Sequence, residues 1–164
     1  SAALTWGGLY DFRHCTFANY WPYGVRPDEL LAMNNFVEDE NGNITAFEFD
    51  AYFGNCIAYG RNIEELLFSF DEGAPYNYLF DHCLLKTEKD ISDQVRFRNS
   101  FRNEDPLFKD YQEGDYSLDT LSPAIDYGTL DVINTSAIDL SNDILNVNRL
   151  PEPDLGAYEF VPGR

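Results

Sequence analysis

Apolar and polar residues alternate along three stretches of the chain, and each stretch ends in the same short box. The second stretch is the clearest: its apolar positions are Phe47, Phe49, Ala51 and Phe53. A period of two predicts a β-strand with one buried face. The matching positions are Trp6, Gly8, Tyr10 and Phe12 in the first stretch, and Tyr78 and Phe80 in the third.

Each box has the form Phe-x-x-Cys, with His or Asn directly before the Cys. The copies are Phe12 to Cys15, Phe53 to Cys56 and Phe80 to Cys83, with a weaker fourth copy from Phe97 to Ser100. The step of three from Phe to Cys breaks the alternation, so the chain turns between them. Because Asn, and less readily His, tolerates a left-handed backbone, the residue before each Cys is predicted to form a corner.

Stacking these units places like residues in inward columns, as in a parallel β-solenoid. The first column holds Phe12, Phe53, Phe80 and Phe97, the second Cys15, Cys56, Cys83 and Ser100, and the third Phe17, Ala58 and Leu85, followed by Arg102, which does not fit. Cys56 and Cys83 lie 27 residues apart, but Cys15 and Cys56 lie 41 apart. We therefore expect an insertion in the first interval, over residues 24–43, with a strand near residues 30–33.

The character of the chain changes after Asn103, where turn-rich phrases replace the alternation. We divide the chain into solenoid coils over 1–103 and a C-terminal cap over 104–164. A wrap over the open end of the solenoid would hide unpaired strand edges. At the other end, the strand pattern begins by Leu4 with no cap before it. This favours a segment of a longer solenoid, with upstream coils of the same chain as its partner.

Charge restricts the classes of ligand. The 164 residues include 29 acidic and 11 basic residues, for a formal net charge of −18. Such a field repels nucleic acid, anionic lipid headgroups and polyuronate chains. It leaves neutral ligands or cations as easier partners, although a solvated acidic surface accounts for the charge without any ligand. The sequence contains no long apolar run, so no transmembrane segment is predicted.

The three cysteines cannot all pair within the chain, and stacked parallel strands give poor disulfide geometry. We predict buried free thiols and no metal site, because the two histidines lie on different levels. The acidic stretch 38–43 contains Asn-Gly and hints at calcium, but its spacing does not match an EF-hand loop. We interpret it as a solvated turn and predict no cofactor.

The aromatic cluster Tyr20, Trp21 and Tyr23 is the candidate ligand-binding site. Exposed aromatic rings beside a groove can stack on sugar rings, although packing against the solenoid wall is the commoner use of such residues. The outward acids Glu48, Asp50 and Asp81 could lie near one another on neighbouring coils. With so many acids in the chain, such proximity is expected by chance, and the catalytic residues stay unknown.

Four phrases of the tail carry a resemblance to a known group. They are Asp-Pro-Leu-Phe at 105–108, Gly-Asp-Tyr-Ser-Leu at 114–118, Ser-Pro-Ala-Ile-Asp-Tyr-Gly at 122–128 and Pro-Asp-Leu-Gly-Ala-Tyr-Glu-Phe at 153–160. In this order they resemble the C-terminal end of bacterial right-handed parallel β-helix proteins. These are pectin-lyase-like, often of the choice-of-anchor Q type, and common on Bacteroidetes-type bacteria. The resemblance implies an all-β right-handed parallel β-helix with a C-terminal cap, located outside the cell or on the bacterial surface.

One stretch departs from the pattern of that group. Over residues 143–149, Asn146 stands in place of Gly and Asn148 in place of Pro, whereas Arg149 is retained. Asn tolerates the positive φ that Gly would adopt. Arg149 is expected to bond carbonyls or a carboxylate within the cap.

Two functions from different classes fit the sequence. The first is a non-catalytic surface segment that binds glycan or displays a scaffold, because no catalytic cluster converges. The alternative is part of a polysaccharide lyase or glycoside hydrolase whose active groove lies mainly on upstream coils. The fold alone does not choose between them, because the same scaffold carries many functions.

Overall fold

The computed structural model describes residues 1–24 and 26–163, and these are all-β apart from one short helix, α1 (Leu130–Asn134). Three parallel sheets form the main body. In chain order, the first sheet contains β1 (Ala2–Leu4), β4 (Leu31–Asn34) and β9 (Leu66–Ser69). The second sheet contains β2 (Gly8–Arg13), β7 (Phe49–Gly54), β10 (Tyr76–Asp81) and β12 (Phe97–Arg98). The third sheet contains β3 (Thr16–Asn19), β8 (Ile57–Gly60), β11 (Leu84–Leu85) and β13 (Phe101–Arg102).

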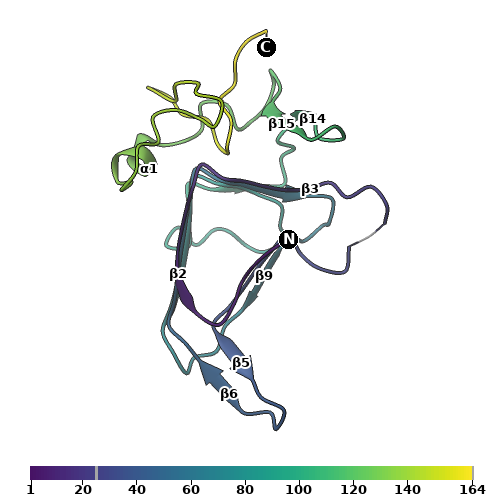
Figure 1. Cartoon of the computed structure of the whole chain (residues 1–164), viewed down its shortest axis with the longest axis vertical. Coiled ribbons are helices and arrows are strands. Elements are labelled where there is room, and N and C mark those ends of the chain that lie inside the picture. The colour runs from purple at the N-terminus through teal and green to yellow at the C-terminus, as the bar shows by residue number, and fades with distance from the viewer. Residues whose placement is uncertain (25, 164) are drawn as a thin grey trace.

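The three sheets form the sides of a triangle, and the chain visits them in a fixed order (Figure 1). We call each passage through the sheets a circuit. The first circuit is β1–β2–β3, the second β4–β7–β8, the third β9–β10–β11, and the fourth only β12–β13. Each strand pairs in parallel with its counterpart in the next circuit. Stacked parallel sheets of this kind are compatible with a β-helix-like fold.

The predicted corner before each Cys is confirmed. The φ angles of His14, Asn55, His82 and Asn99 are 50°, 52°, 51° and 47°. Each of these residues lies between a strand of the second sheet and the next part of the chain, which leads to the third sheet. The left-handed conformation therefore turns the chain at the same place on every level, which keeps the columns on both sides of the corner in line.

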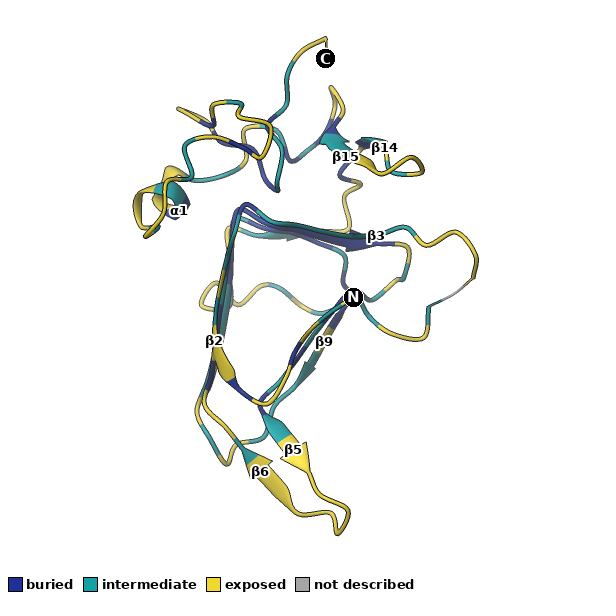
Figure 2. Ribbon diagram, in the orientation of Figure 1, coloured by how far each residue is buried: buried dark blue, intermediate teal, exposed yellow. Residues whose placement is uncertain are grey.

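The predicted inward columns are also confirmed. Phe12, Phe53, Phe80 and Phe97 are direct register partners, with successive ring centroids 5.1, 4.5 and 5.6 Å apart. The second column is linked by hydrogen bonds: the Cys15 amide lies 3.4 Å from the Cys56 sulfur, and the Cys83 amide 3.0 Å from the Ser100 hydroxyl. Most of the buried hydrophobic residues belong to the three sheets that form the triangle (Figure 2).

The third column ends as its sequence suggests. Phe17, Ala58, Leu85 and Arg102 are register partners across four levels. Arg102 is exposed, and its guanidinium donates to the carbonyl of Thr87 instead of entering the core. A charged side chain is thus accepted at this position because it lies in the last circuit.

Two residues assigned to inward faces lie outside. Trp6 and Phe47 are 65% and 40% exposed and precede β2 and β7 instead of belonging to them. Trp6 has a φ of 65°, so the chain is still turning there and the alternation has not begun. The inward pattern of these strands is carried instead by Tyr10, Phe12 and the residues from Phe49 onward.

The extra length of the first interval is divided between two loops, which corrects the expectation of one insertion over 24–43. Residues 20–30 join β3 to β4, whereas the equivalent loop in the next circuit is only 61–65. Residues 35–48 join β4 to β7 and contain an antiparallel hairpin, β5 (Phe36–Glu38) and β6 (Ile44–Ala46). Between these loops, β4 is a regular strand, as predicted for residues near 30–33.

Segment 86–96 covers the end of the stack at the fourth circuit. It stands where a first-sheet strand of that circuit would lie, and in Figure 1 it crosses the inside of the triangle. Ile91 packs against the core cluster. The Lys89 ammonium lies 5.4 Å from the ring centroid of Phe68, and the Arg96 guanidinium 4.7 Å from that of Tyr78. These cation–π contacts place two charged side chains of the segment against aromatic rings of the third circuit.

The tail covers a side of the triangle, whereas the sequence predicted that residues 104–164 would cover its open end. The tail contains α1 and the hairpin β14 (Phe108–Asp110) and β15 (Asp115–Leu118), and it packs on the outer face of the third sheet (Figure 1). The reason is that this outer face is apolar. Ile57 and Leu84 point outward there and are fully buried against Leu118 and Leu155.

Contacts of the tail extend from the first circuit to the last. Thr16 accepts a hydrogen bond of 3.0 Å from a tail amide. Asn55 exchanges two hydrogen bonds with Thr129, of 2.9 and 3.0 Å. At the fourth circuit, the ring of Phe101 lies 4.5 Å from that of Tyr127. The tail is therefore bound at several levels of the stack and not at one edge.

Both expectations for residues 143–149 are confirmed. Asn146 has a φ of 66°, the left-handed conformation that a glycine would adopt. Arg149 is buried, donates to the Ala157 carbonyl at 3.2 Å and pairs with the carboxylate of Glu159. Arg149 thus holds the end of the tail together and does not face solvent.

The three thiols are free, and we expect them to react slowly with Ellman's reagent at pH 8. The Cys56 hydrogen bond and burial raise the pKa of Cys15, and burial raises that of Cys56, so few thiolates form. The native reaction should be at least about a hundredfold slower than that after unfolding in guanidinium, with half-buried Cys15 reacting first. Fast modification of two or more thiols in the native protein would contradict the column geometry.

Candidate functional site

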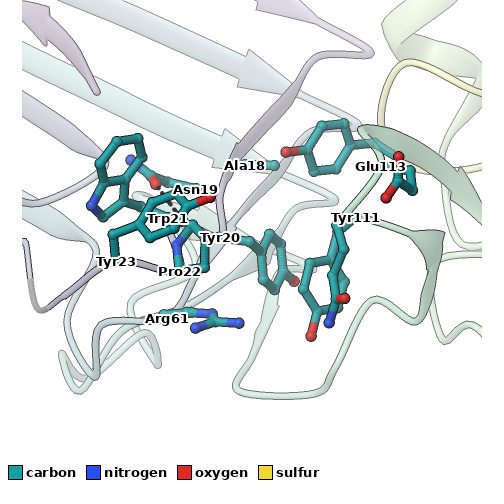
Figure 3. Close-up of a pocket in the computed structure, with 11 residues that line it drawn as sticks. Ala18, Asn19, Tyr20, Trp21, Pro22, Tyr23, Arg61, Tyr111 and Glu113 are labelled. Atoms are coloured by element: carbon teal, nitrogen blue, oxygen red, sulfur yellow. Dashed lines mark hydrogen bonds between the residues drawn. The ribbon is translucent and has the colours of Figure 1, made fainter.

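The predicted aromatic cluster lies in the loop that follows β3, beside a surface cleft of about 550 Å³. The opposite wall comes from the β14–β15 hairpin of the tail (Figure 3). The cleft is lined by Ala18, Asn19, Tyr20, Trp21, Pro22, Tyr23, Arg61, Tyr111, Gln112, Glu113 and Tyr116. Its size is that of ordinary small-molecule sites, which measure about 300–1,000 Å³.

The structure separates Tyr20 from the other two predicted aromatic residues. The Tyr20 ring stacks on Tyr111, with centroids 4.2 Å apart and planes 23° from parallel, and it meets Phe108 edge-on at 6.0 Å. Burial raises the pKa of Tyr20 well above its ordinary value. One ring face is thus occupied by the tail, and Tyr20 anchors the loop to the hairpin and is not free to stack on a ligand.

Trp21 and Tyr23 remain available to a ligand. They are 55% and 83% exposed and pack edge-on against each other, with centroids 5.2 Å apart. Asn19 fixes the start of this turn, because its side-chain oxygen accepts a hydrogen bond of 3.2 Å from the Trp21 amide. Figure 3 shows Trp21 and Tyr23 on one side of Tyr20, with Tyr111 on the other. Two exposed rings therefore border the cleft on its open side.

The remaining lining residues are mostly planar and polar. Asn19, Arg61, Gln112 and Glu113 offer amide, guanidinium and carboxylate groups along the cleft. Arg61 is positioned by the next circuit, where its amide donates to the Asn19 carbonyl at 3.2 Å. Aromatic faces beside planar hydrogen-bonding groups can hold a ligand that has both an apolar face and hydroxyl groups.

Sequence reasoning missed the tail side of this cleft. Tyr111 and Tyr116 flank the tight turn of the β14–β15 hairpin, which contains Gly114 with a φ of 83°. The two tyrosines on either side of a glycine turn were the sequence signal that could have indicated this aromatic wall. Their distance in sequence from Tyr20 hid the contact.

The outward acids Glu48, Asp50 and Asp81 do not form a close group. Asp81 stands beside Gly54 in the second sheet, four residues along β7 from Asp50. At the rise of a β-strand this corresponds to ~13 Å, and Glu48 precedes Asp50 on the same segment. The carboxylates of a glycosidase pair lie about 5–10 Å apart. Asp81 is therefore too far from Asp50 to form such a pair with it.

Asp81 is fully engaged within the protein. Its carboxylate accepts hydrogen bonds from His82 Nδ1 at 2.8 Å, Arg98 Nε at 3.0 Å and the Tyr52 hydroxyl at 3.1 Å. Burial raises the pKa of Asp81, but the hydrogen bonds from His82 and Arg98 and the charge of Arg98 outweigh this and hold the pKa well below its usual range. Asp81 is a buried anion that ties the third circuit to the fourth.

The acidic stretch 38–43 forms the turn of the β5–β6 hairpin. Asp39 accepts hydrogen bonds of 2.9 Å from the amides of Asn41 and Asn43. Hydrogen bonds from Asn43 and Asn41 lower the pKa of Asp39. Over residues 1–24 and 26–163, no group of three or more His, Cys, Asp or Glu side chains is arranged to hold a metal ion. In the same residues, no helix has the length and apolar character needed to cross a membrane.

Comparisons with known proteins give no relative for this chain. No protein-family model, no curated protein and no solved structure matches it.

Proposed function

We propose that the stacked circuits are coils of a right-handed parallel β-helix, and that the chain is an exported segment of the pectin-lyase-like, choice-of-anchor Q kind. The parallel register of the three sheets supports the coil architecture. The four tail phrases and the positive φ of Asn146 support the likeness to that group. Such a protein would act outside the cell or on a bacterial surface.

We further propose that this segment binds a neutral carbohydrate without cleaving it. The observation that carries the proposal is the pair of exposed rings, Trp21 and Tyr23, at the edge of a cleft lined by planar polar groups. The apolar face of a sugar ring stacks on aromatic rings, and its hydroxyls pair with amide and guanidinium groups. Asn19, Arg61 and Gln112 are the polar partners in this proposal.

Charge favours a neutral ligand over a polyuronate. The net charge of −18 opposes the approach of an anionic chain. Within the cleft, Arg61 and Glu113 carry opposite charges, so the lining itself has no excess of positive charge. A neutral glycan meets no such barrier.

The alternative, an enzyme segment whose groove lies mainly on further coils, predicts a different result. The Asp81 carboxylate is fully engaged and stands ~13 Å from Asp50 along the strand direction, which favours the non-catalytic proposal. Incubation of the chain with the glycans it binds, followed by analysis of reducing ends and unsaturated products, separates the two. Product release by this chain would refute non-catalytic binding.

The first test is binding to a broad glycan array, followed by titration of tryptophan fluorescence. The chain has two tryptophans, so a Trp6→Phe variant leaves Trp21 as the only indole. A neutral glycan from the array should shift the emission of that variant. Trp21→Ala should weaken binding about five- to tenfold, because losing one aromatic stacking contact costs about 1 kcal/mol or slightly more.

Two controls make this result specific. Trp6 is an exposed tryptophan outside the cleft, so Trp6→Ala should leave affinity unchanged. Tyr23→Ala should weaken binding in the same direction as Trp21→Ala. Equal affinity of the Trp21→Ala, Tyr23→Ala and parent chains would place any glycan elsewhere, and absence of binding on the array would refute the proposal.

A further inference from the structure

The first circuit exposes one complete edge of the stack. β1, β2 and β3 each occupy the terminal position of their sheet. The amides of Gly8 and His14 donate to Glu48 and Gly54 in the second circuit. Because amide direction alternates along a strand, the N–H groups of Leu9, Asp11 and Arg13 point to the opposite side. In the described part of the chain, no strand pairs with that side.

The inward side chains of the first circuit are also incompletely covered. Tyr10, Phe12, Cys15 and Phe17 are half-buried, whereas their counterparts in the second circuit are fully buried. Phe12 stacks on Phe53 on one side, and its other side has no register partner among residues 1–24 and 26–163. The first circuit therefore presents apolar columns together with unpaired backbone groups.

The two ends of the stack are not equivalent. At the fourth circuit, segment 86–96 lies across the triangle and Phe97 is buried. The long loop 20–24 and 26–30, which follows the first circuit, and the β5–β6 hairpin of the second circuit extend outward from the triangle (Figure 1) and do not cross it. Exposed strand edges are ready sites for strand addition, and natural proteins usually protect them.

We propose that the first circuit is a docking face for one further circuit of the same repeat, running parallel to it and joined to the N-terminus. Every strand pair between existing circuits is parallel, so the added circuit would continue an interface that the chain already uses. It would place an aromatic residue over Phe12 and a small residue over Cys15, with strand spacing of about 4.8 Å. The N-terminus lies at a corner of the triangle, where such a circuit connects (Figure 1).

A second copy of the chain fits this face less well. Two copies joined face to face through the first circuit would run antiparallel. The segment from Phe12 to Cys15 of one copy would then lie beside the same segment of the other copy running in the opposite direction. In that arrangement phenylalanine would not stack on phenylalanine, nor cysteine on cysteine. The parallel addition keeps both columns and also pairs the free amides of β2. This inference is independent of carbohydrate binding, which concerns the loop after β3.

The test is a chain in which a copy of residues 31–65 is inserted directly before Ala2. This copy contains one strand for each sheet and ends where the native second circuit passes to β9. Hydrogen exchange at the amides of Leu9, Asp11 and Arg13 should slow by at least about tenfold, because these groups gain strand partners. The urea midpoint should rise as well, because each repeat is stabilised by its neighbour.

The matched control carries the same extension with its copies of Ala51 and Phe53 replaced by Asp. It should leave exchange at the three amides as fast as in the parent chain. Unchanged exchange with the intact extension would overturn the proposal. Sedimentation equilibrium of the parent chain is a second test, because a dimer abolished by Phe12→Asp would assign this face to a second copy instead.

Discussion

Phe53→Ala is expected to lower the free energy of unfolding by about 3–5 kcal/mol, the largest effect expected of any single substitution in the core. Phe53 has no exposed surface and lies between Phe12 and Phe80, with ring centroids 5.1 and 4.5 Å away. Its removal loses burial and two stacking contacts, and it leaves a cavity that the rigid strands cannot close. Urea unfolding followed by circular dichroism measures the change.

Phe47→Ala is the matched control, because it is the same substitution on the same segment. Phe47 is 40% exposed and lies outside β7. Its loss should cost about 1 kcal/mol or less, in line with partial burial. Equal costs for the two substitutions would show that the phenylalanine column is not the centre of the core.

Acidification from pH 6.5 to pH 4.5 is expected to remove about 2–3 kcal/mol of stability through His14 alone. Burial, together with the charge of Arg149, lowers the pKa of His14 to about 3. The Asn55 side chain lies 3.1 Å from His14 Nε2, and its orientation is fixed because its oxygen accepts from the Thr129 amide. Asn55 thus presents a donor to Nε2, which opposes a proton there.

The sign of this pH effect follows from comparing proton binding by His14 in the folded and unfolded states. An unfolded histidine takes up a proton near pH 6.5, whereas folded His14 does so only near pH 3. The unfolded chain therefore binds more protons between these values, and acid favours it. The contribution is complete above pH 6.5 and is lost as the pH falls through this window. Urea unfolding at half-unit steps of pH measures the slope.

His14→Asn isolates this effect, because asparagine occupies the equivalent corners at Asn55 and Asn99 with the same positive φ. Compared with the parent chain, the variant should lose about 2–3 kcal/mol less stability between pH 6.5 and pH 4.5, whatever its stability at pH 7. Glu159 acts in the opposite direction, since burial and the charge of Asp154 raise its pKa to about 7. Its contribution is present below pH 4.5 and is lost as the pH rises toward 7. An unchanged slope in His14→Asn would contradict the assignment.

The repeated part of the fold could be predicted because its signals are local. The corner at Asn55 and the column position of Phe53 follow from residues within a few places of each other. The place of the tail could not be predicted in the same way. It depends on the outward residues Ile57 and Leu84 being apolar, and in a short strand these look the same as inward residues.

The candidate site likewise has a part that could be predicted from the sequence and a part that could not. Composition and spacing located Tyr20, Trp21 and Tyr23, and all three line one cleft. The sequence could not tell which ring would be covered, because Tyr111, about ninety residues later, covers Tyr20 alone. Contacts between such distant segments have no local pattern, so the division into one anchor and two free rings required the structure.

The attachment of the tail at several levels has a consequence for how the stack comes apart. A row of repeats held only by nearest neighbours can fray from either end, one repeat at a time. Here the tail contacts Thr16 in the first circuit, Asn55 in the second and Phe101 in the fourth. Opening any of these circuits also disturbs the tail, and through it the others. The tail therefore makes a linear array lose its structure as one cooperative unit.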